Sequence, residues 1–348
     1  MKRIIATFFL ITTMIITQTG CSSEITPVSV DNYYLDTTCN ITVYGTGEIG
    51  TAKADADWEL DEEVAHTAID EAYKLCAKLD KTLSRTAEAS DITKINSALG
   101  QWVEVSDYTI ELLHKGVEFS ELSDGAFDIT IGGVTSMWDF HAENPEVPEG
   151  EALGEAADHV DWHKLEFGEG NTVRLTDLRT KIDLGGIAKG YIGDKMAEVL
   201  VENGVNSAII NLGGNIICIG SKPDGSAFTI GVETPYSDRT EISGTLEACD
   251  QTVVTSGVYE RYFEVNGVKY HHILSTKTGW PVKTDVVAVT LVSDIGRSAD
   301  IDALSTICLI KGSEEGLAFI EGVEGVEATF TLEDGSRLST SGMQFKEQ

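Results

Sequence analysis

The chain is organised around the sequence KIDLGGIAKGYIGD at residues 181–194, which leads on to NLGGN at residues 211–215. Ile182 and Leu184 predict a strand that enters a double glycine, and the apolar spacing that follows predicts a helix ending at Asn203-Gly204. Glycines let backbone N–H groups approach a ligand, and the start of a helix favours anions. We therefore expect a phosphate site here, with a purely structural glycine turn as the alternative.

The N-terminus is predicted to be a processing segment that precedes the fold. Lys2 and Arg3 stand before an apolar run at residues 4–16, which is too short to cross a bilayer and fits the core of a signal peptide. Residues 1–20 are therefore expected to be a lipoprotein-type signal peptide. Gly20-Cys21 resembles the bacterial lipobox, so we expect Cys21 to be lipidated and the exported protein to be anchored at the extracytoplasmic face of the bacterial cell membrane. Ordinary secretion is the alternative.

The rest of the chain is divided into three parts. Residues 21–34 contain Ser, Thr and Pro and are predicted to be a tether between the membrane and the fold. Residues 35–335 are predicted to form one domain, with two lobes as an option, and residues 336–348 a C-terminal tail. With 348 residues in all, the chain is long enough to bury a large core.

Charge and cysteine content argue against several classes of protein. The chain has 25 Lys and Arg against 57 Asp and Glu, a net charge of −32. Because binding to a phosphate backbone needs clustered basic residues, this balance argues against a nucleic-acid-binding protein. The cysteines that follow Cys21 have no CxxC spacing, so neither a disulfide scaffold nor a zinc site is predicted.

Local signals predict a mixture of helices and hairpins. Residues 61–83 carry apolar positions at helical spacing behind an acidic first turn, and three further helices have N-caps predicted at Ser90, Ser106 and Ser298. Asn266-Gly267 predicts a tight turn between two strands, residues 259–265 and 268–274. This mixture predicts an α+β fold with mixed or antiparallel sheets and packed helices, rather than a doubly wound parallel sheet.

Two further places carry residues suited to catalysis. His271 and His272 are successive residues of a predicted strand, so their side chains should point to opposite faces. Asp302 and Thr306 are four apart on a predicted helix and share one face, where their oxygens suit Mg²⁺. An anion pocket beside a hard cation fits the cleavage of a pyrophosphate. The alternatives are a hydrogen-bonded histidine with no catalytic role and a solvated helix face.

Eight segments, taken in order, resemble the bacterial flavin transferase family of ApbE type, the FAD:protein FMN transferases, over residues 34–335. The matching segments are Leu35-Asp36-Thr37, Ser90-Asp91-Ile92 with Ile95-Asn96, residues 125–130, residues 183–191, residues 211–215, Thr255-Ser256-Gly257 with Tyr259-Glu260-Arg261, His271-His272-Ile273 with Thr278-Gly279, and residues 302–306.

The resemblance implies a fold and an activity. The fold would be the T-fold-like architecture of ApbE proteins. The activity would be Mg²⁺-dependent transfer of FMN from FAD to a Thr or Ser of an acceptor protein through a phosphoester bond, with release of AMP. The acceptor would be a flavoprotein subunit of a membrane redox complex or a related exported protein.

The resemblance also implies the site residues. Mg²⁺ would be held by Asp302, Thr306 and the backbone carbonyl of Ala188, and His272 would be catalytic. FAD, the substrate, is expected in a cleft between residues 125–130 and residues 183–191, with its pyrophosphate over the glycines. The residues expected to contact FAD are Asp36, Asp128, Thr130, Asp183, Gly185, Gly186, Lys189, Gly213, Gly214, Ser256, Gly257 and Arg261.

One departure from the family pattern follows the histidines. The family usually has Leu or Ile followed by Asp-Pro there, whereas this chain has Leu274-Ser275-Thr276. A missing carboxylate three residues from His272 can alter the orientation or the pKa of that histidine. Two alternatives therefore stay open: a FAD pyrophosphatase that releases FMN and AMP, and a non-catalytic flavin-binding lipoprotein.

Overall fold

The computed structural model describes residues 26–47, 58–140, 142–237 and 241–348. The predicted signal peptide, residues 1–20, and the predicted lipidation site, Cys21, lie outside the described residues. No helix within the described ranges is both long enough and apolar enough to cross a membrane.

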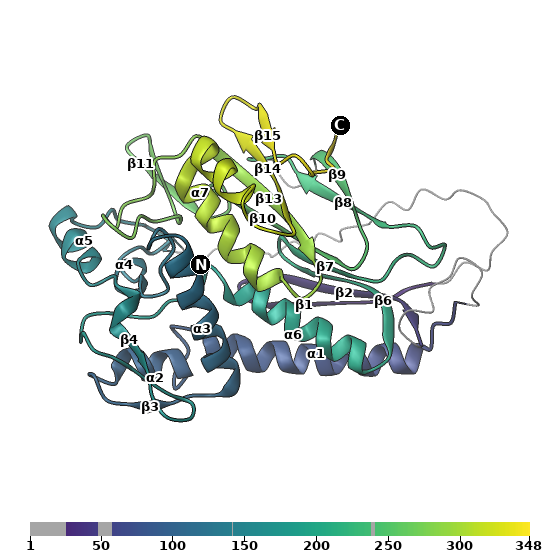
Figure 1. Ribbon diagram of the computed structural model, residues 1–348, viewed down its shortest axis with the longest axis horizontal. Helices are drawn as coiled ribbons and strands as arrows, with labels where there is room; N and C mark the ends of the chain where they lie inside the picture. The colour runs from purple at the N-terminus through teal and green to yellow at the C-terminus, as the bar shows by residue number, and fades with distance from the viewer. Residues whose placement is uncertain (1–25, 48–57, 141, 238–240) are drawn as a thin grey trace, which may run out of the picture.

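An eight-stranded antiparallel sheet forms the centre of the fold (Figure 1). Every pair of neighbouring strands in it is antiparallel, which confirms the predicted α+β class. In spatial order the strands are β1 (Val28–Tyr34), β2 (Thr37–Thr46), β6 (Val205–Leu212), β7 (Asn215–Ile219), β10 (Gln251–Gly257), β13 (Val286–Asp294), β14 (Val326–Leu332) and β15 (Arg337–Ser339).

Both faces of this sheet are covered, because its strands are apolar on both sides. Ile210, Ile217 and Val254 pack toward the helices, whereas their neighbours Cys218 and Val253 pack into a second core. Such alternation follows from the two-residue period of a strand. The helical face carries α1 (Glu62–Leu83), α6 (Ala188–Glu202) and α7 (Ser298–Ile320); the other face carries a three-stranded sheet of β8 (Phe228–Glu233), β9 (Ile242–Ala248) and β16 (Lys346–Glu347).

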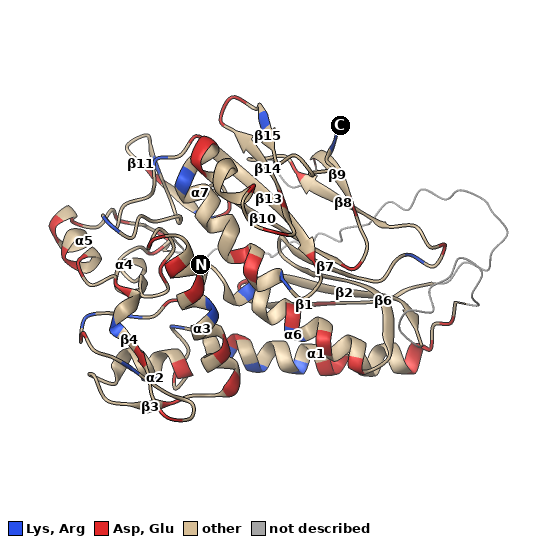
Figure 2. Cartoon of the chain, viewed as in Figure 1, with Lys and Arg blue, Asp and Glu red and all other residues tan. Residues whose placement is uncertain are grey.

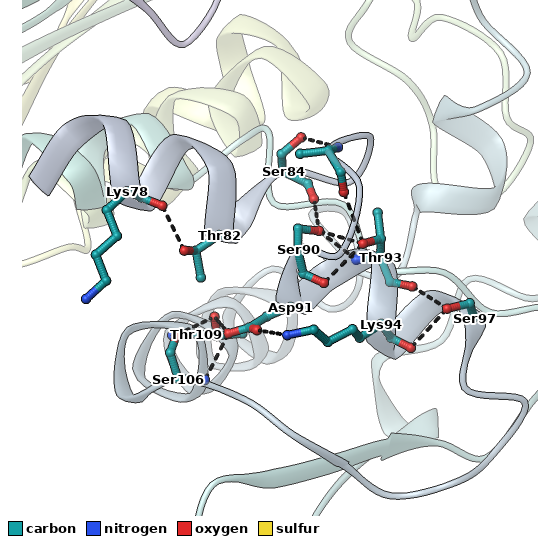
Figure 3. A network of polar contacts seen from close by, with 11 residues as sticks. Lys78, Thr82, Ser84, Ser90, Asp91, Thr93, Lys94, Ser97, Ser106 and Thr109 are labelled. Carbon is teal, nitrogen blue, oxygen red and sulfur yellow. Dashed lines mark hydrogen bonds and ion pairs between the residues drawn. The ribbon is translucent and has the colours of Figure 1, made fainter. Parts of the chain in front are cut away.

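The segment between α1 and α6 forms a smaller unit at one end of the helices (Figure 1). Its α2 and α3 begin at the predicted caps, since the hydroxyls of Ser90 and Ser106 accept hydrogen bonds from the N–H groups of Thr93 and Thr109 (Figure 3). The elements are α2 (Asp91–Ser97), β3 (Val103–Glu104), α3 (Asp107–Leu122), α4 (Gly132–Thr135), α5 (Gly150–Ala157), a 3₁₀ turn (Trp162–Lys164), β4 (Leu165–Phe167) and β5 (Thr172–Leu175).

A separate hairpin lies between the smaller unit and α7 (Figure 1). Its strands are β11 (Tyr262–Val265) and β12 (Val268–His271), each shorter than predicted. Asn266 and Gly267 both have positive φ, 53° and 79°, as the predicted two-residue turn requires. The inner face of the hairpin closes a small core with Trp138 and Leu153.

Two predicted boundaries are wrong. Residues 21–34 were predicted to be a tether, but Val28–Tyr34 is the edge strand β1 and pairs along its whole length with β2. Residues 336–348 were predicted to be a tail, but they contribute β15 and β16, and Thr340 is buried. Edge strands pair on one side only and are often short. They therefore carry few apolar residues and are hard to recognise in a sequence.

The strand predicted at Ile182 and Leu184 is also absent. Both side chains are buried, but the only ladder contact nearby is an isolated parallel bridge between Ile131 and Lys181. The side chain of Asn96 replaces a strand partner: its Oδ1 accepts from the Ile182 N–H at 2.6 Å and its Nδ2 donates to the Ile182 carbonyl at 2.9 Å. One amide side chain thus satisfies the buried backbone that a strand would have satisfied.

The N-terminus of α7 is capped by a carboxylate from another helix, not by Ser298 as predicted. Asp194, on α6, accepts hydrogen bonds from the N–H groups of Ser298 and Ala299, each at 3.0 Å. The Ser298 hydroxyl is buried without a partner among the described residues. Burial raises the pKa of Asp194 to about 6, against the opposing effect of these two N–H donors. The contact joins α6 to α7 directly beside the site.

None of the described cysteines forms a disulfide. Cys39, Cys76, Cys218 and Cys308 are buried and Cys249 is exposed, and all five are free thiols. They pack as small apolar residues, so neither a disulfide scaffold nor a zinc site is present in the described part of the chain.

Candidate active site

Asp302 and Thr306 face the glycine turn between residues 185 and 190. Asp302 is 4% exposed, and its Oδ2 accepts from the N–H of Gly190 at 2.9 Å. A Cβ on Gly186 would lie 3.5 Å from the Thr306 hydroxyl oxygen, which places Thr306 against the turn. The Thr306 hydroxyl makes no hydrogen bond to another described residue, and Asp302 keeps Oδ1 available. The predicted pairing of these two residues on one helix face is confirmed by their shared contact with the turn.

These oxygens fit a hard divalent cation. Among the described residues no group of three His, Cys, Asp or Glu could hold a metal, so a cation here would also need neutral oxygen ligands beside Asp302. Asn215 supplies an independent observation: it is fully buried, and neither its Oδ1 nor its Nδ2 makes a hydrogen bond of normal geometry. Its amide lies close enough to Asp302 to lower the pKa of that carboxyl group. Unpaired buried polar atoms are costly, which favours a ligand that completes the site.

Lys189 lies among the charged groups of the site. Its Nζ donates to the Gly213 carbonyl at 3.5 Å, which places it between the two glycine turns. Its charge lowers the pKa of both Asp302 and Glu260, although burial raises each of them overall. An ammonium group at a helix start is unfavourable unless anions surround it. The position therefore suits a lysine that contacts a phosphate.

His272 and His271 point to different partners, as their alternation predicted. The Nδ1 of His272 lies 3.1 Å from the Arg261 carbonyl oxygen, so it carries the proton and Nε2 keeps a free lone pair. Burial lowers the pKa of His272 to about 4, with smaller contributions from the charges of Arg261, His271 and Lys189. The Nε2 of His271 instead donates to the carbonyl of Val282 at 3.1 Å. His272 is thus a neutral imidazole with one nitrogen available.

Asp128 and Thr130 are hydrogen-bonded to each other and to the segment that follows α5. Both are buried: Asp128 Oδ1 accepts from the Thr130 N–H and hydroxyl, and its Oδ2 from the Trp162 N–H at 3.0 Å. The Thr130 hydroxyl oxygen accepts in turn from the Asp161 N–H. Buried polar oxygens are almost always hydrogen-bonded, and here the donors belong to the protein itself. These side chains therefore hold residues 161–162 against the loop.

At Gly186 the 125–130 loop packs against the glycine turn. The Phe127 ring lies against Gly186, where a Cβ would come within 3.0 Å of it. A cavity of about 500 Å³ opens on the other side of Ile182, lined by the basic residues Arg85, Arg179 and Lys181. This cavity does not include His272, Asp302 or Thr306. We therefore place the candidate active site at these three residues and not in the cavity.

Asp183 positions the glycine turn. Its Oδ1 accepts from the Gly185 N–H at 2.8 Å. Its Oδ2 accepts from the Thr135 hydroxyl at 2.6 Å and is paired with Arg85 at 2.9 Å. Both oxygens thus have partners inside the protein, and through them Asp183 orients the turn. Gly185 itself is exposed and Gly186 partly so, which leaves the backbone open to a ligand.

The second glycine turn lies against the β1–β2 connection. Gly213 and Gly214 have φ of 64° and 107°, which favour glycine, and a Cβ on Gly213 would meet the Thr37 side chain at 2.1 Å. Thr37 follows Asp36, which is exposed and has a φ of 57° at the tip of the connection. Residues 176 positions apart are therefore brought together as the resemblance implied, with the Asp36 carboxylate accessible.

Ser256 and Gly257, at the end of β10, and Arg261, just before β11, border the site. The Ser256 hydroxyl lies 2.7 Å from that of Ser305, which ties β10 to α7. The N–H of Gly257 donates to Glu260 at 3.1 Å, and the exposed Arg261 holds His272 through its carbonyl. The Ser256 hydroxyl and the Gly257 N–H are thus hydrogen-bonded within the protein.

Thr276, in the segment that departs from the family pattern, has a structural role of its own. It is buried, and its hydroxyl donates to the carbonyl of Gly125 at 2.7 Å. The N–H of Ser275 donates to the Trp280 carbonyl, which closes the turn after the histidines. Thr276 therefore links this turn to the 125–130 loop through a hydrogen bond, although the sequence here departs from the family pattern.

Sequence reasoning did not select two residues of this site. Asn215 belonged to the quoted glycine segment, and its burial without partners became visible only in three dimensions. Glu260 is accessible to solvent but largely surrounded by protein, with Lys189 and Asp302 among the charges that act on its pKa. The only signal for either was its place inside a matching segment.

Comparisons with known proteins agree with this arrangement. The model of the ApbE family matches residues 35–330. Over 293 residues the chain is 32% identical to the FAD:protein FMN transferase of Treponema pallidum (strain Nichols), covering 80% of each chain.

Solved structures are similar as well. The crystal structure of the ApbE protein from Thermotoga maritima has a TM-score of 0.78 and 30% identity, covering 91% of this chain and 97% of that one. The apo flavinyl transferase ApbE of Pseudomonas stutzeri has a TM-score of 0.76 and 28% identity, covering 91% and 95%. The family model, the relative and the fold agree with the site geometry: the chain belongs to the ApbE family.

Proposed function

We propose that the protein transfers FMN from FAD to a threonine or serine hydroxyl of an acceptor protein and releases AMP. The relatives' shared name, FAD:protein FMN transferase, supports the reaction. The observation that carries it is the arrangement in one site of a neutral His272, a buried Asp302 beside a free Thr306 hydroxyl, and Lys189 between two glycine turns.

His272 acts as the general base. Its Nδ1–H is held by the Arg261 carbonyl, so Nε2 takes the proton of the acceptor hydroxyl. The hydroxyl oxygen forms a bond to the phosphorus of the FMN moiety, and the bond from that phosphorus to the bridging oxygen breaks. AMP leaves with the electron pair of that bond, and the proton held at Nε2 returns to solvent or product. The oxygen–phosphorus bond formed is the phosphoester that retains the flavin.

Mg²⁺ is part of this proposal. Asp302, Thr306 and the carbonyl of Ala188 would hold the ion, because they supply hard oxygens beside the glycine turn. When bound, the ion neutralises charge on the pyrophosphate oxygens. Lys189 adds a fixed positive charge, and the exposed backbone of Gly185 lets the phosphates come close.

The test measures FMN transfer and AMP release separately. The protein is incubated with FAD, Mg²⁺ and the acceptor protein of the Treponema pallidum relative, and the acceptor is examined by mass spectrometry. An added FMN mass on that acceptor is the expected result. AMP release without acceptor labelling would instead identify a FAD pyrophosphatase. If neither AMP release nor labelling is observed, the protein binds flavin without catalysing a reaction.

The location of the protein belongs to the same proposal. We infer that the protein is exported and lipid-anchored through Cys21 at the extracytoplasmic face of the bacterial cell membrane, where its acceptor would be a subunit of a membrane redox complex. Support comes from the apolar run at residues 4–16 and the Gly20-Cys21 pair. Cys21→Ser should move the protein from the membrane fraction to the soluble fraction. Unchanged membrane association would rule out this anchor.

A further inference from the structure

A row of tyrosines beside the site ends in a lysine, and none of it is used by the chemistry above. We define the tyrosine patch as Tyr236, Tyr262 and Lys269, with Tyr259 at its inner end. Tyr236 is 50% exposed and Tyr262 is 40% exposed, which is unusual for rings this large. Lys269 lies over both rings, its Nζ at 4.5 Å from the Tyr236 centroid and 5.3 Å from that of Tyr262.

The tyrosine patch is continuous with the active site. The Tyr259 ring lies over Gly257, where a Cβ would come within 2.3 Å of the ring. The Tyr236 ring centroid is 5.5 Å from that of Tyr259 and 6.2 Å from that of Tyr262. Tyr262 directly follows Arg261, whose carbonyl holds the catalytic histidine. A molecule seated on the patch therefore lies against Gly257 at the border of the site, on the hairpin face that also carries His271.

Tyr236 is held in place at a conformational cost. Its φ is 60°, and it is the third residue of a turn that the Ser237 N–H closes onto the Thr234 carbonyl at 3.1 Å. With Pro235 in the second position, this is a place that glycine or asparagine usually occupies. Such strain is retained where the surroundings impose it, and it is concentrated at functional positions.

The geometry argues against a flat ligand such as the isoalloxazine ring in this patch. Lys269 occupies one face of Tyr236 and one face of Tyr262, which leaves less ring surface for stacking. The rings also lie at 54° and 78° to each other along the row, so they leave no parallel slot. Exposed tyrosines beside a lysine are the chemistry of a protein interface.

We propose that the tyrosine patch is the docking surface for the acceptor polypeptide. This inference rests on the proposed function, which requires a protein hydroxyl to reach His272. Glu264 lies opposite Lys269 across the hairpin, but no ion pair joins the two side chains, and Lys269 instead lies over the tyrosine rings. Basic side chains are sparse in this acidic chain (Figure 2). The acceptor segment therefore carries an acidic residue near its modified threonine or serine, which pairs with Lys269 while the tyrosines supply contact area.

Binding and turnover are measured separately to test the proposal. The probe is the acceptor protein of the Treponema pallidum relative, used as such for turnover and with its modified residue changed to alanine for binding. Tyr236→Ala, Tyr262→Ala and Lys269→Glu are compared with the parent and with Leu338→Ala. Leu338 is an exposed apolar residue on β15, at the edge of the large sheet, and serves as the matched control.

Each patch substitution should weaken acceptor binding about tenfold or more, the effect expected of a central aromatic or charged contact. The Kd for FAD and the rate of AMP release without acceptor should stay within about twofold of the parent. Lys269→Glu should also abolish the salt dependence of acceptor binding. Leu338→Ala should change none of these, and Tyr262→Phe should retain most of the binding.

The other outcomes overturn the proposal. Weaker FAD binding in the tyrosine variants would assign the patch to the flavin, and unchanged acceptor affinity in all three variants would exclude it as a docking surface. If the parent binds the acceptor through the patch but does not label it, the docking surface stands and the transferase function fails. The two inferences can therefore be distinguished.

Discussion

His272 should stay neutral at pH values where an ordinary histidine is protonated. Its pKa is lowered from 6.5 to about 4, chiefly by burial and further by the charges of Arg261, His271 and Lys189, against the hydrogen bond to the Arg261 carbonyl. At pH 5.5 a pKa of about 4 leaves roughly 97% of the imidazole neutral, whereas a pKa of about 6.5 would leave roughly 9%. The population of the base differs by about tenfold between the two cases at this pH.

A direct titration separates this histidine from other groups. The imidazole resonances are followed by NMR from pH 3.5 to 8, and the His272 signal is identified by its loss in His272→Gln. The rate of FMN transfer alone is not sufficient, because burial also raises the pKa of Asp302 and its protonation would remove activity on the acid side. A His272 midpoint near 6.5 would refute the assigned environment.

His272→Gln and His271→Gln together test the roles of the two histidines. His272→Gln should reduce transfer by roughly 10²- to 10⁴-fold, the usual contribution of a general base, with FAD affinity retained. His271→Gln should reduce it far less, because its Nε2 is bound to the carbonyl of Val282 outside the reacting groups. Equal losses in the two variants would contradict the placement of His272 at the reacting hydroxyl.

Two further predictions concern the metal ligands and the glycine turn. Asp302→Asn keeps an oxygen for the Gly190 N–H but removes the charge, so transfer should be lost in a folded protein, whereas Thr306→Ala should only raise the Mg²⁺ concentration needed for half-maximal rate; parental activity of Asp302→Asn at limiting Mg²⁺ would place the metal elsewhere. Asn96→Ala leaves the buried N–H and carbonyl of residue 182 without partners and should lower the free energy of unfolding by roughly 2–4 kcal/mol in urea denaturation, whereas Ser97→Ala, an exposed neighbour on the same helix, should change it by less than about 0.5 kcal/mol.

Features that depend on a few adjacent residues were predictable from the sequence. The caps at Ser90 and Ser106, the turn at Asn266-Gly267 and the helix end at Asn203-Gly204 all follow from side chains or φ angles within about four residues of one another. The pairing of Asp302 with Thr306 is of the same kind, since a helix places residues four apart on one face.

Site residues were harder to assign, because a motif shows which residues matter without showing what their atoms do. Asp128, Thr130 and Asp183 lie in matching segments and were expected to contact FAD. Their oxygens have partners among the N–H, hydroxyl and guanidinium groups of the surrounding protein. A carboxylate in a conspicuous loop looks the same in sequence whether it faces a ligand or a backbone amide.

The sequence by itself determined the α+β class, the two glycine turns, the hairpin with its histidines and the helix that carries Asp302, because each depends on local backbone preferences or a short repeat. The tertiary structure alone decided that Asn96 satisfies the backbone of Ile182, that Asp194 caps α7, and that residues 28–34 join the sheet. These contacts join segments up to about a hundred residues apart, and which polar groups meet there depends on how the apolar faces pack. Local propensity cannot encode that choice, because the partners become neighbours only once the core has formed.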